Sequence, residues 1–286
     1  MPRTSLNAGV PMSSVTSKTA AILKAALLGL VLLFLGAGVW AALVQANLAH
    51  LRSVPWAVPV MAVFLWLYWR YLGGAFWPRG NSEARRALLR ANRVPPAVFA
   101  WAALAGGLAV IALAGLWIVL FQLVRMPLNA LPDLSRYSWF TVVTLIGMSA
   151  IAAPLTEEPA FRGYCQVILE RHFRGPTAIV LSSVFFAIAH GPTQGFLWPK
   201  LLFYFLTGAV FGATAYLTRS ILPAIPAHFF GLLVFFTLIW PHDAARRLIA
   251  DSGADAWFWI HVGQIVVSAL LAVWAFLRLA SGEIRN

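Results

Sequence analysis

Long apolar stretches alternate with short polar segments along the whole chain, and this pattern predicts membrane-spanning helices. A membrane-spanning helix needs about 20 apolar residues, and no strand-like alternation of period two competes with these runs. We therefore expect an all-α fold, a polytopic membrane helix bundle of about eight transmembrane helices. The expected spans are Ala20–Val44, Val54–Leu72, Val98–Val124, Trp139–Leu155, Pro176–His190, Leu201–Leu217, Ile221–Ile239 and Trp257–Leu279.

The spans and the segments between them divide the chain into four parts. We expect a polar cytoplasmic N-terminal tail over residues 1–19, then three helices and a basic cytoplasmic loop over residues 20–138. Residues 139–240 form the core that carries the candidate chemistry, and residues 241–286 form a final helix with a short basic tail. The basic loop, Ser82–Arg93, predicts a short helix on the membrane surface, which Ser82 can cap.

Composition supports a membrane protein and gives its expected orientation. The chain is 61% hydrophobic and only 10% charged, whereas soluble domains carry roughly 25% charged residues. The net charge of +12 could suggest nucleic acid, but the basic residues lie in short loops, so we expect no nucleic-acid partner. Of the 21 Lys and Arg residues, fifteen lie on the side of the termini and six on the other side. Both termini are therefore expected in the cytoplasm.

Two adjacent carboxylates, Glu157 and Glu158, follow a long apolar run and precede Arg162. Ionisable groups inside a membrane are rare and usually functional. On a helix Glu158 and Arg162 are i,i+4 neighbours and can form an ion pair, while Glu157 points about 100° away. For Glu158 and Arg162 we favour a buried salt bridge that joins helices. For Glu157 we favour catalysis as a general base.

Two histidines are expected at the height of Glu157. Glu157 precedes the break at residues 174–176 by about sixteen residues and His190 follows it by about fifteen, so two antiparallel helices would bring them level. His228 lies shortly after the next turn and can share this level. Phe186 lies one helical turn before His190 and is expected to pack beneath its imidazole.

One glutamate and two histidines can activate water in two ways. They can bind a divalent metal as zinc-type ligands. Alternatively, the glutamate deprotonates water while the histidines donate to the developing oxyanion. Spacing does not choose between the two, and both lead to hydrolysis. The candidate catalytic residues and metal ligands are Glu157, His190 and His228, and the supporting residues are Glu158, Arg162 and Phe186.

These residues also carry a family resemblance. Residues 157–162 read EEPAFR and match the motif EExxxR, Phe186 and His190 match FxxxH, and His228 supplies the His of an HxxxN-type motif. Over about residues 141–238 the chain resembles the CAAX protease and bacteriocin-processing (CPBP, or ABI) family, which is related to the type II CaaX prenyl endopeptidase. The chain departs from the family pattern at Leu232, where the family often has Asn.

The resemblance implies an intramembrane endopeptidase of metallo- or glutamic type. Its substrate would be a membrane-associated or lipid-anchored peptide or protein, and its other partner would be membrane lipid. The protein would be a multi-pass protein of the bacterial cell (inner) membrane. Glu157 would activate water, His190 would assist, and His228 would stabilise the oxyanion or hold a metal. Cofactor dependence stays open between none and a divalent metal such as Zn. The alternatives are a proton-coupled membrane transporter and a non-catalytic membrane scaffold of the same fold.

Two further sequence features predict packing rather than chemistry. Gly208 and Gly212 form a G-x-x-x-G pair, which allows another helix to approach closely. Cys165, the single cysteine, excludes an internal disulfide, and we expect it to be packed in the bundle.

Overall fold

The computed structural model describes residues 12–50, 53–127 and 136–281. Helix makes up 84% of the structure, and no strand occurs among these residues. The described segments contain seven helical spans that are long and apolar enough to cross a membrane, together with one shorter apolar helix, Ala57–Leu72. The predicted polytopic bundle of about eight helices is confirmed.

From the N-terminus, the described residues form α-helices, π-helical turns (η1, η4, η5) and 3₁₀ turns (η2, η6). They are α1 (Met12–Leu33), η1 (Phe34–Gly38), α2 (Val39–His50), α3 (Ala57–Leu72), η2 (Arg79–Asn81), α4 (Ser82–Leu89), α5 (Pro96–Leu123), α6 (Trp139–Glu157), η4 (Glu158–Cys165), α7 (Gln166–Glu170), α8 (Gly175–Gln194), α9 (Trp198–Thr218), α10 (Ala224–Val234), η5 (Phe235–Ile239), η6 (Trp240–Ala245), α11 (Ile249–Ser252) and α12 (Ala256–Ala280).

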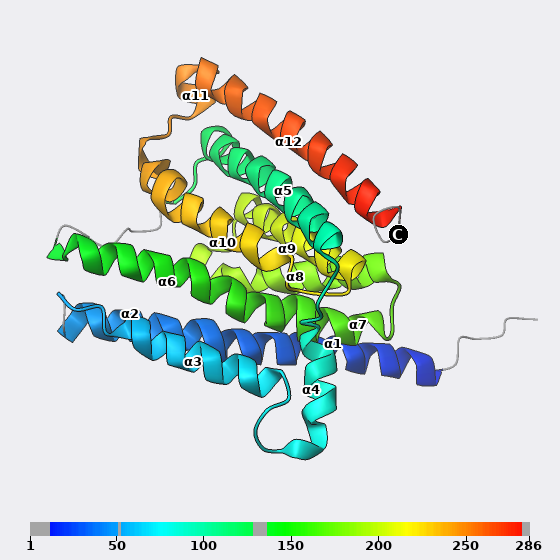
Figure 1. Cartoon of the computed structure of the whole chain (residues 1–286). Helices are drawn as coiled ribbons and strands as arrows, with labels where there is room; N and C mark the ends of the chain where they lie inside the picture. Colours follow the sequence, from blue (N-terminus) through cyan, green and yellow to red (C-terminus); the bar gives the residue numbers. More distant parts are fainter. Residues whose placement is uncertain (1–11, 51–52, 128–135, 282–286) are drawn as a thin grey trace, which may run out of the picture.

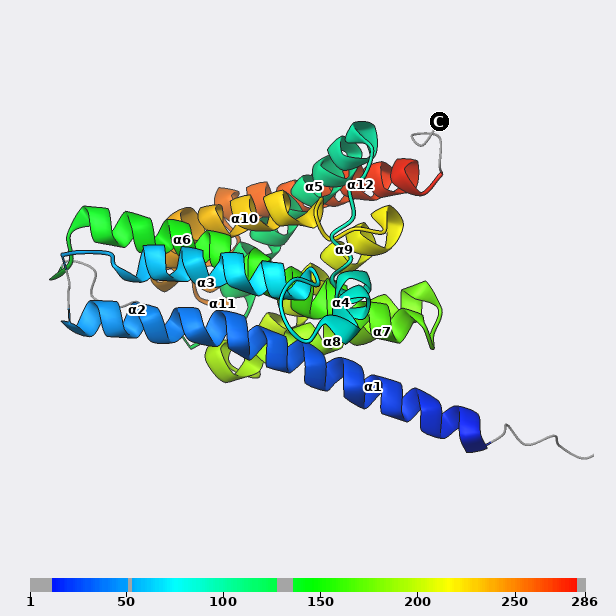
Figure 2. The same cartoon turned by 60° about the horizontal axis from the view of Figure 1, so that its bottom comes forward.

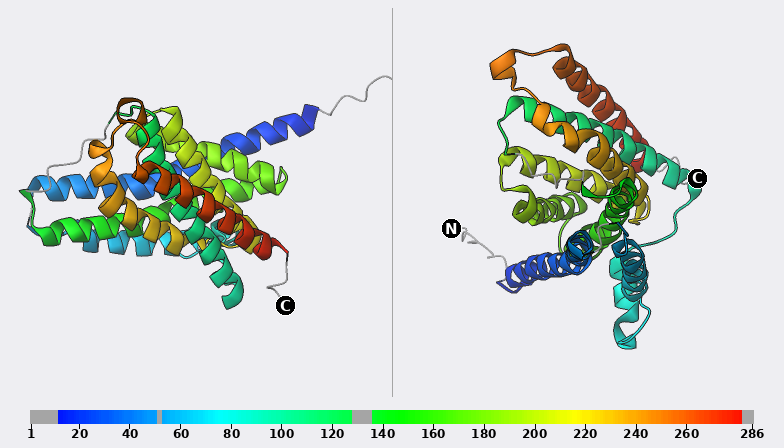
Figure 3. Two further views of the ribbon diagram at one scale, coloured as in Figure 1. Left: turned by 90° about the horizontal axis from the view of Figure 1, so that it is seen from above. Right: turned by 90° about the vertical axis from the view of Figure 1, so that its left-hand side faces the viewer.

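The helices are stacked in successive layers (Figure 1). Helices α1 to α3 form one side of the bundle, α6 lies beside them, α8 to α10 lie in the middle, and α5 and α12 pair on the far side. Helix α1 continues through η1 into α2, and its N-terminal part extends beyond the other helices (Figure 2). Helix α4 stands out from the bundle below α3 (Figure 3). The hairpin of α8 and α9 and the segment η4 enclose the centre of the core.

The fourth predicted span, Trp139–Leu155, ends too early. Helix α6 continues through η4 and α7 to Glu170, so the two carboxylates lie within one span of 32 residues. This continuation passes Pro159, which lacks an N–H group for the carbonyl of Leu155. The indole N–H of Trp69 donates to that carbonyl at 2.8 Å, and the helix widens into π-helical turns at the same place. The proline therefore changes the helix without ending it.

Other predicted boundaries also differ. The second span begins at Ala57 rather than Val54, and the seventh begins at Ala224 and continues to Ala245. Of the predicted polar tail, residues 1–11 lie outside the described residues, and α1 is helical from Met12 onward. The last residues of the predicted basic tail, 282–286, also lie outside the described residues.

The predicted basic surface helix forms as α4, but the assignment of Ser82 as its cap is wrong. Asn81 precedes the helix, and no side chain caps the first turn. Arg85 is buried, and its guanidinium group donates to the carbonyls of Tyr71, Ala75 and Pro78 at 2.9, 2.9 and 3.1 Å. This arginine therefore holds the α3–α4 loop together.

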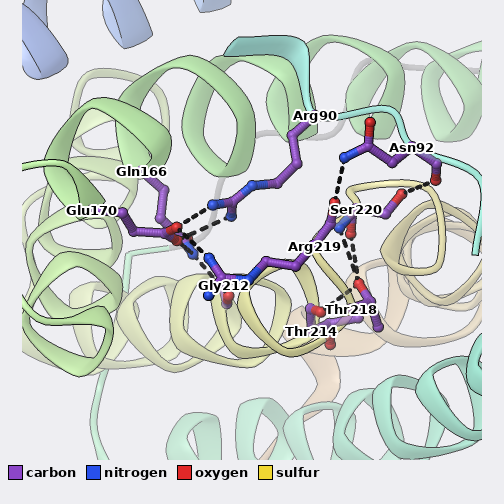
Figure 4. A network of polar contacts seen from close by, with 9 residues as sticks. All are labelled: Arg90, Asn92, Gln166, Glu170, Gly212, Thr214, Thr218, Arg219 and Ser220. Carbon is purple, nitrogen blue, oxygen red and sulfur yellow. Dashed lines mark hydrogen bonds and ion pairs between the residues drawn. The ribbon is translucent and has the colours of Figure 1, made fainter. Parts of the chain in front are cut away.

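A polar network joins the α4–α5 connection, helix α7 and the α9–α10 turn at one end of the bundle (Figure 4). Arg90, at the end of α4, forms a bidentate ion pair with Glu170, and Gln166 donates a third hydrogen bond to this carboxylate at 2.9 Å. Arg219, at the end of α9, approaches the same carboxylate at 3.5 Å. Asn92 donates to the carbonyl of Arg219 at 2.7 Å. The network holds the turn before α10 against the long helix that carries Glu157.

Replacing Glu170 with alanine is expected to lower the free energy of unfolding by about 2 kcal/mol. Arg90 would keep its buried position without a carboxylate, and breaking a buried pair on one side is destabilising. We place the loss below the usual range because the side chains of Arg90 and Glu170 are still 8% and 10% exposed, so water can partly solvate the arginine that remains. Thermal denaturation of the detergent-solubilised protein measures it. The control is Asp251→Ala, which removes an ion pair whose members, Arg125 and Asp251, are exposed and should cost under about 1 kcal/mol. Equal losses in the two variants would contradict the prediction.

Candidate active site

The three predicted catalytic side chains meet at one place in the bundle, each from a different helix. Glu157 ends α6, His190 lies on α8 and His228 on α10. The Glu157 Oε1 atom lies 3.9 Å from Nε2 of His190, and its Oε2 atom lies 3.7 Å from Nε2 of His228. Glu157 and His228 are buried, and the side chain of His190 is 16% exposed. The common height predicted from spacing is found in the structure.

Both imidazole rings are oriented by a partner at Nδ1. The Nδ1 atom of His190 lies 2.8 Å from the carbonyl oxygen of Phe186, and that of His228 lies 2.9 Å from Oε1 of Glu158. A carbonyl and a carboxylate oxygen only accept, so each Nδ1 carries the hydrogen atom. In the neutral rings, Nε2 is then an acceptor and faces Glu157.

Glu158 and Arg162 form the predicted ion pair, and Glu158 does more than was predicted. Arg162 Nη1 lies 3.5 Å from Glu158 Oε1, and both side chains are almost fully buried. The same Oε1 atom accepts from His228. The sequence pattern places Arg162 and Lys200 with the basic residues of the loops. Both are buried inside the bundle instead, with exposed fractions of 1% and 2%. Glu158 therefore links the arginine to a catalytic candidate.

Aromatic rings hold both histidines in place. Phe186 lies 4.4 Å from the ring of His190, as predicted, and Tyr204 stacks on the same imidazole at 4.0 Å with an interplanar angle of 17°. Phe211 stacks on His228 at 4.7 Å and 20°. The Arg162 guanidinium group lies over Phe186 at 4.1 Å and over Phe211 at 5.5 Å. The same positively charged group therefore contacts both aromatic rings, Phe186 beside His190 and Phe211 beside His228.

Sequence reasoning missed Tyr204 and Phe211, although the sequence held a signal for them. Gly208 and Gly212 lie on the face of α9 that approaches its neighbours: a Cβ atom at Gly208 would lie 2.9 Å from Ser183, and one at Gly212 would lie 2.9 Å from Gln166 Oε1. Tyr204 precedes Gly208 by one helical turn, and Phe211 lies on the same side. The glycine pair thus marks the face of α9 that meets the site.

A cavity of about 500 Å³ lies against the three catalytic candidates. Its walls are mostly apolar and come from α1, η1, α2, α5, α6, α8, α9, α10 and η5. Leu232, one turn after His228, is part of the wall, so the departure from the family motif lies within the site. Phe34 lines the cavity, is 60% exposed, and lies in the candidate membrane span Ser17–His50. The cavity therefore borders an exposed residue of this candidate span at η1.

π-Helical turns border this cavity on several sides. Turns η1 and η5 contribute to its walls, and η4 begins directly after Glu157. Such turns insert an extra residue and often occur at functional sites. Here η1 and η5 form part of the cavity wall, and η4 follows Glu157 in the chain.

The predicted metal ligands do not have the spacing of a tetrahedral zinc site. Among the described residues, no group of three or more His, Cys, Asp or Glu side chains is arranged to hold a metal ion. The carboxylate–imidazole separations of 3.9 and 3.7 Å exceed the ~3.4 Å between tetrahedral ligands that each lie ~2.1 Å from zinc. The metal assignment of Glu157, His190 and His228 stays a prediction.

Comparison with known proteins agrees with the motifs. Residues 138–234 match the family described as type II CAAX prenyl endopeptidase Rce1-like. The matched segment contains Glu157, His190 and His228, and it confirms the resemblance read from the sequence. No curated protein and no solved structure matches the chain. The description of the matched family names a peptidase of the CAAX type.

Proposed function

We propose that this chain, whose residues 138–234 carry a core of the Rce1-like family, is an intramembrane endopeptidase that hydrolyses a peptide bond of a lipid-anchored substrate. One observation carries the proposal. A carboxylate and two imidazole Nε2 atoms converge on one point in the wall of an apolar cavity. This arrangement suits the activation of a water molecule.

The distances support a shared water between the three groups. At 3.9 and 3.7 Å, Glu157 is too far from either Nε2 atom for a direct hydrogen bond, and such separations are commonly bridged by water. Water donates one hydrogen to Glu157 and the other to an Nε2 acceptor, and its oxygen lone pair attacks the carbonyl carbon. Glu157 takes the first proton. It then returns this proton to the leaving amine as the carbon–nitrogen bond breaks.

The position of the cavity supports a substrate held in the membrane. Its walls are mostly apolar, and Phe34 in one wall is 60% exposed on a helix that is long and apolar enough to cross a membrane. A lipid-anchored peptide could reach Glu157 from the bilayer without exposing its apolar anchor to water. The family description, prenyl endopeptidase, agrees with this substrate class.

We also propose that the protein lies in a bacterial inner membrane with both termini in the cytoplasm. Lys and Arg are enriched on cytoplasmic sides of membrane proteins. After removal of Arg162 and Lys200, which are buried in the bundle, fourteen of the remaining cations still lie on the side of the termini and five on the other. Cysteine labelling from the two sides of inverted vesicles tests this orientation.

Hydrolysis is tested with the purified protein in liposomes that contain a farnesylated CaaX peptide, in water enriched in oxygen-18. We expect two product peptides, with one heavy oxygen atom in the new carboxyl group. A transporter would move the peptide or protons and give no product, and a scaffold would do neither. Absence of product from this peptide and from detergent-extracted membrane proteins would overturn the proposal.

Cleavage is expected to continue after treatment with a strong chelator. In the proposed mechanism Glu157 takes the proton of water directly, so removal of a divalent ion should change the initial rate less than about twofold. The measurement combines the rate after dialysis against EDTA with metal analysis of the same sample. Loss of activity that returns on adding Zn²⁺ would instead support the metal-bound alternative.

A further inference from the structure

The reaction proposed above needs a hydrogen-bond donor for the oxygen that becomes negatively charged. When water attacks, the π electrons of the carbonyl move to its oxygen, and donors aimed at that oxygen are commonly the largest single contribution to catalysis. Both histidines use their Nδ1 hydrogen atoms on Phe186 and Glu158. Their Nε2 atoms face Glu157 as acceptors. A neutral His190 or His228 therefore cannot supply the donor.

The remaining polar groups of the cavity wall narrow the choice. Thr193 donates its hydroxyl hydrogen to the carbonyl of His190 at 3.2 Å, and Thr207 donates to Phe203 at 2.9 Å. Leu232 has no polar atom. Backbone N–H groups in the interior turns of the walls are used within their helices. Gln194, the last residue of α8, already has an interaction partner and is not an uncommitted donor.

Tyr204 is the hydroxyl-bearing side chain of the wall whose hydrogen atom is not committed among the described residues. Its contacts with the described residues are made by the ring, which lies flat against His190 at 4.0 Å and near Phe186 and Phe203. The residue lines the same cavity as Glu157. Stacking on His190 fixes the ring, so the hydroxyl needs little reorganisation to act.

We infer that Tyr204 is a catalytic residue whose phenolic O–H donates a hydrogen bond to the oxyanion of the tetrahedral intermediate. This inference rests on the proposed peptidase function. The proton stays on Tyr204 throughout. The oxyanion electrons re-form the carbonyl when the carbon–nitrogen bond breaks, and the leaving nitrogen takes its proton from Glu157. Tyr204 thus performs the task for which Leu232 offers no group.

The test compares Tyr204→Phe with wild type on the farnesylated peptide in liposomes. Phenylalanine keeps the ring on His190 and removes only the hydroxyl. We expect kcat to fall about 10²-fold, with KM changed less than about threefold. The matched control is Tyr216→Phe on the same helix, because the Tyr216 ring packs beneath Arg219 outside the cavity. It should leave both constants near wild type.

A second readout is independent of turnover. A farnesylated peptide with a phosphinate in place of the scissile amide mimics the tetrahedral oxyanion, and we expect Tyr204→Phe to bind it at least tenfold more weakly while binding the uncleaved peptide equally well. If wild type cleaves the peptide and Glu157→Gln does not, yet Tyr204→Phe keeps full kcat and phosphinate affinity, the role of Tyr204 is refuted and the peptidase proposal stands. If wild type neither cleaves the peptide nor binds the phosphinate, the proposed function fails, and the inference fails with it.

Discussion

Replacing Glu157 with glutamine is expected to lower peptide hydrolysis by about 10³-fold while the protein stays folded. A general base contributes typically 10² to 10⁴-fold, and glutamine has no basic oxygen to take the proton of water. The side chains have nearly the same volume. Glu157 makes no direct hydrogen bond to either histidine, since both separations exceed 3.5 Å, and the variant should therefore pack as wild type does.

The measurement is the initial rate of cleavage in liposomes, with melting temperature as the check on folding. Glu83→Gln is the matched control, because Glu83 is exposed on α4 and should keep the full rate. Comparative proteomics of membranes from strains with wild-type protein and with Glu157→Ala extends the test to natural substrates. Uncleaved precursors should accumulate in the variant strain. Cleavage by Glu157→Gln at the wild-type rate would show that another group activates the water.

The position of Glu157 beside His190 could be predicted because it depends on local quantities. Two helices joined by a short turn place residues level when their distances from the turn are similar, and the rise per residue is fixed. The pairing of Glu158 with Arg162 is likewise a property of one helix. Such relations need no knowledge of the other helices.

The contacts that the sequence did not reveal are set by packing between distant helices. Tyr204 stacks on His190, and Glu158 binds His228 across 70 positions of the chain. Neither follows from a period of 3.6 residues. The continuation of α6 past Pro159 was also missed, because it depends on Trp69 of another helix donating to Leu155. Helix rotation, which decides these contacts, is an outcome of the whole core.

Replacing Glu158 with alanine is expected to lower the free energy of unfolding by about 3–5 kcal/mol, the largest stability loss that we predict. The Arg162 guanidinium group, 1% exposed, would lose its carboxylate partner, and Nδ1 of His228 would lose its acceptor. Removing one member of a buried ion pair leaves the other charge uncompensated in a medium that solvates it poorly. Thermal denaturation of the solubilised protein against Glu83→Ala measures the loss.

A double variant separates the two roles of Glu158. When both members of a buried pair become apolar, stability often returns, so Glu158→Leu with Arg162→Met should melt near wild type. Activity should not return, because His228 would no longer have the carboxylate that fixes its Nδ1 hydrogen and turns Nε2 toward Glu157. If the double variant regained both stability and cleavage, Glu158 would serve the ion pair alone, as its spacing from Arg162 first suggested. A stable but inactive double variant would assign Glu158 to the orientation of His228, a role that only the contact between α10 and η4 reveals.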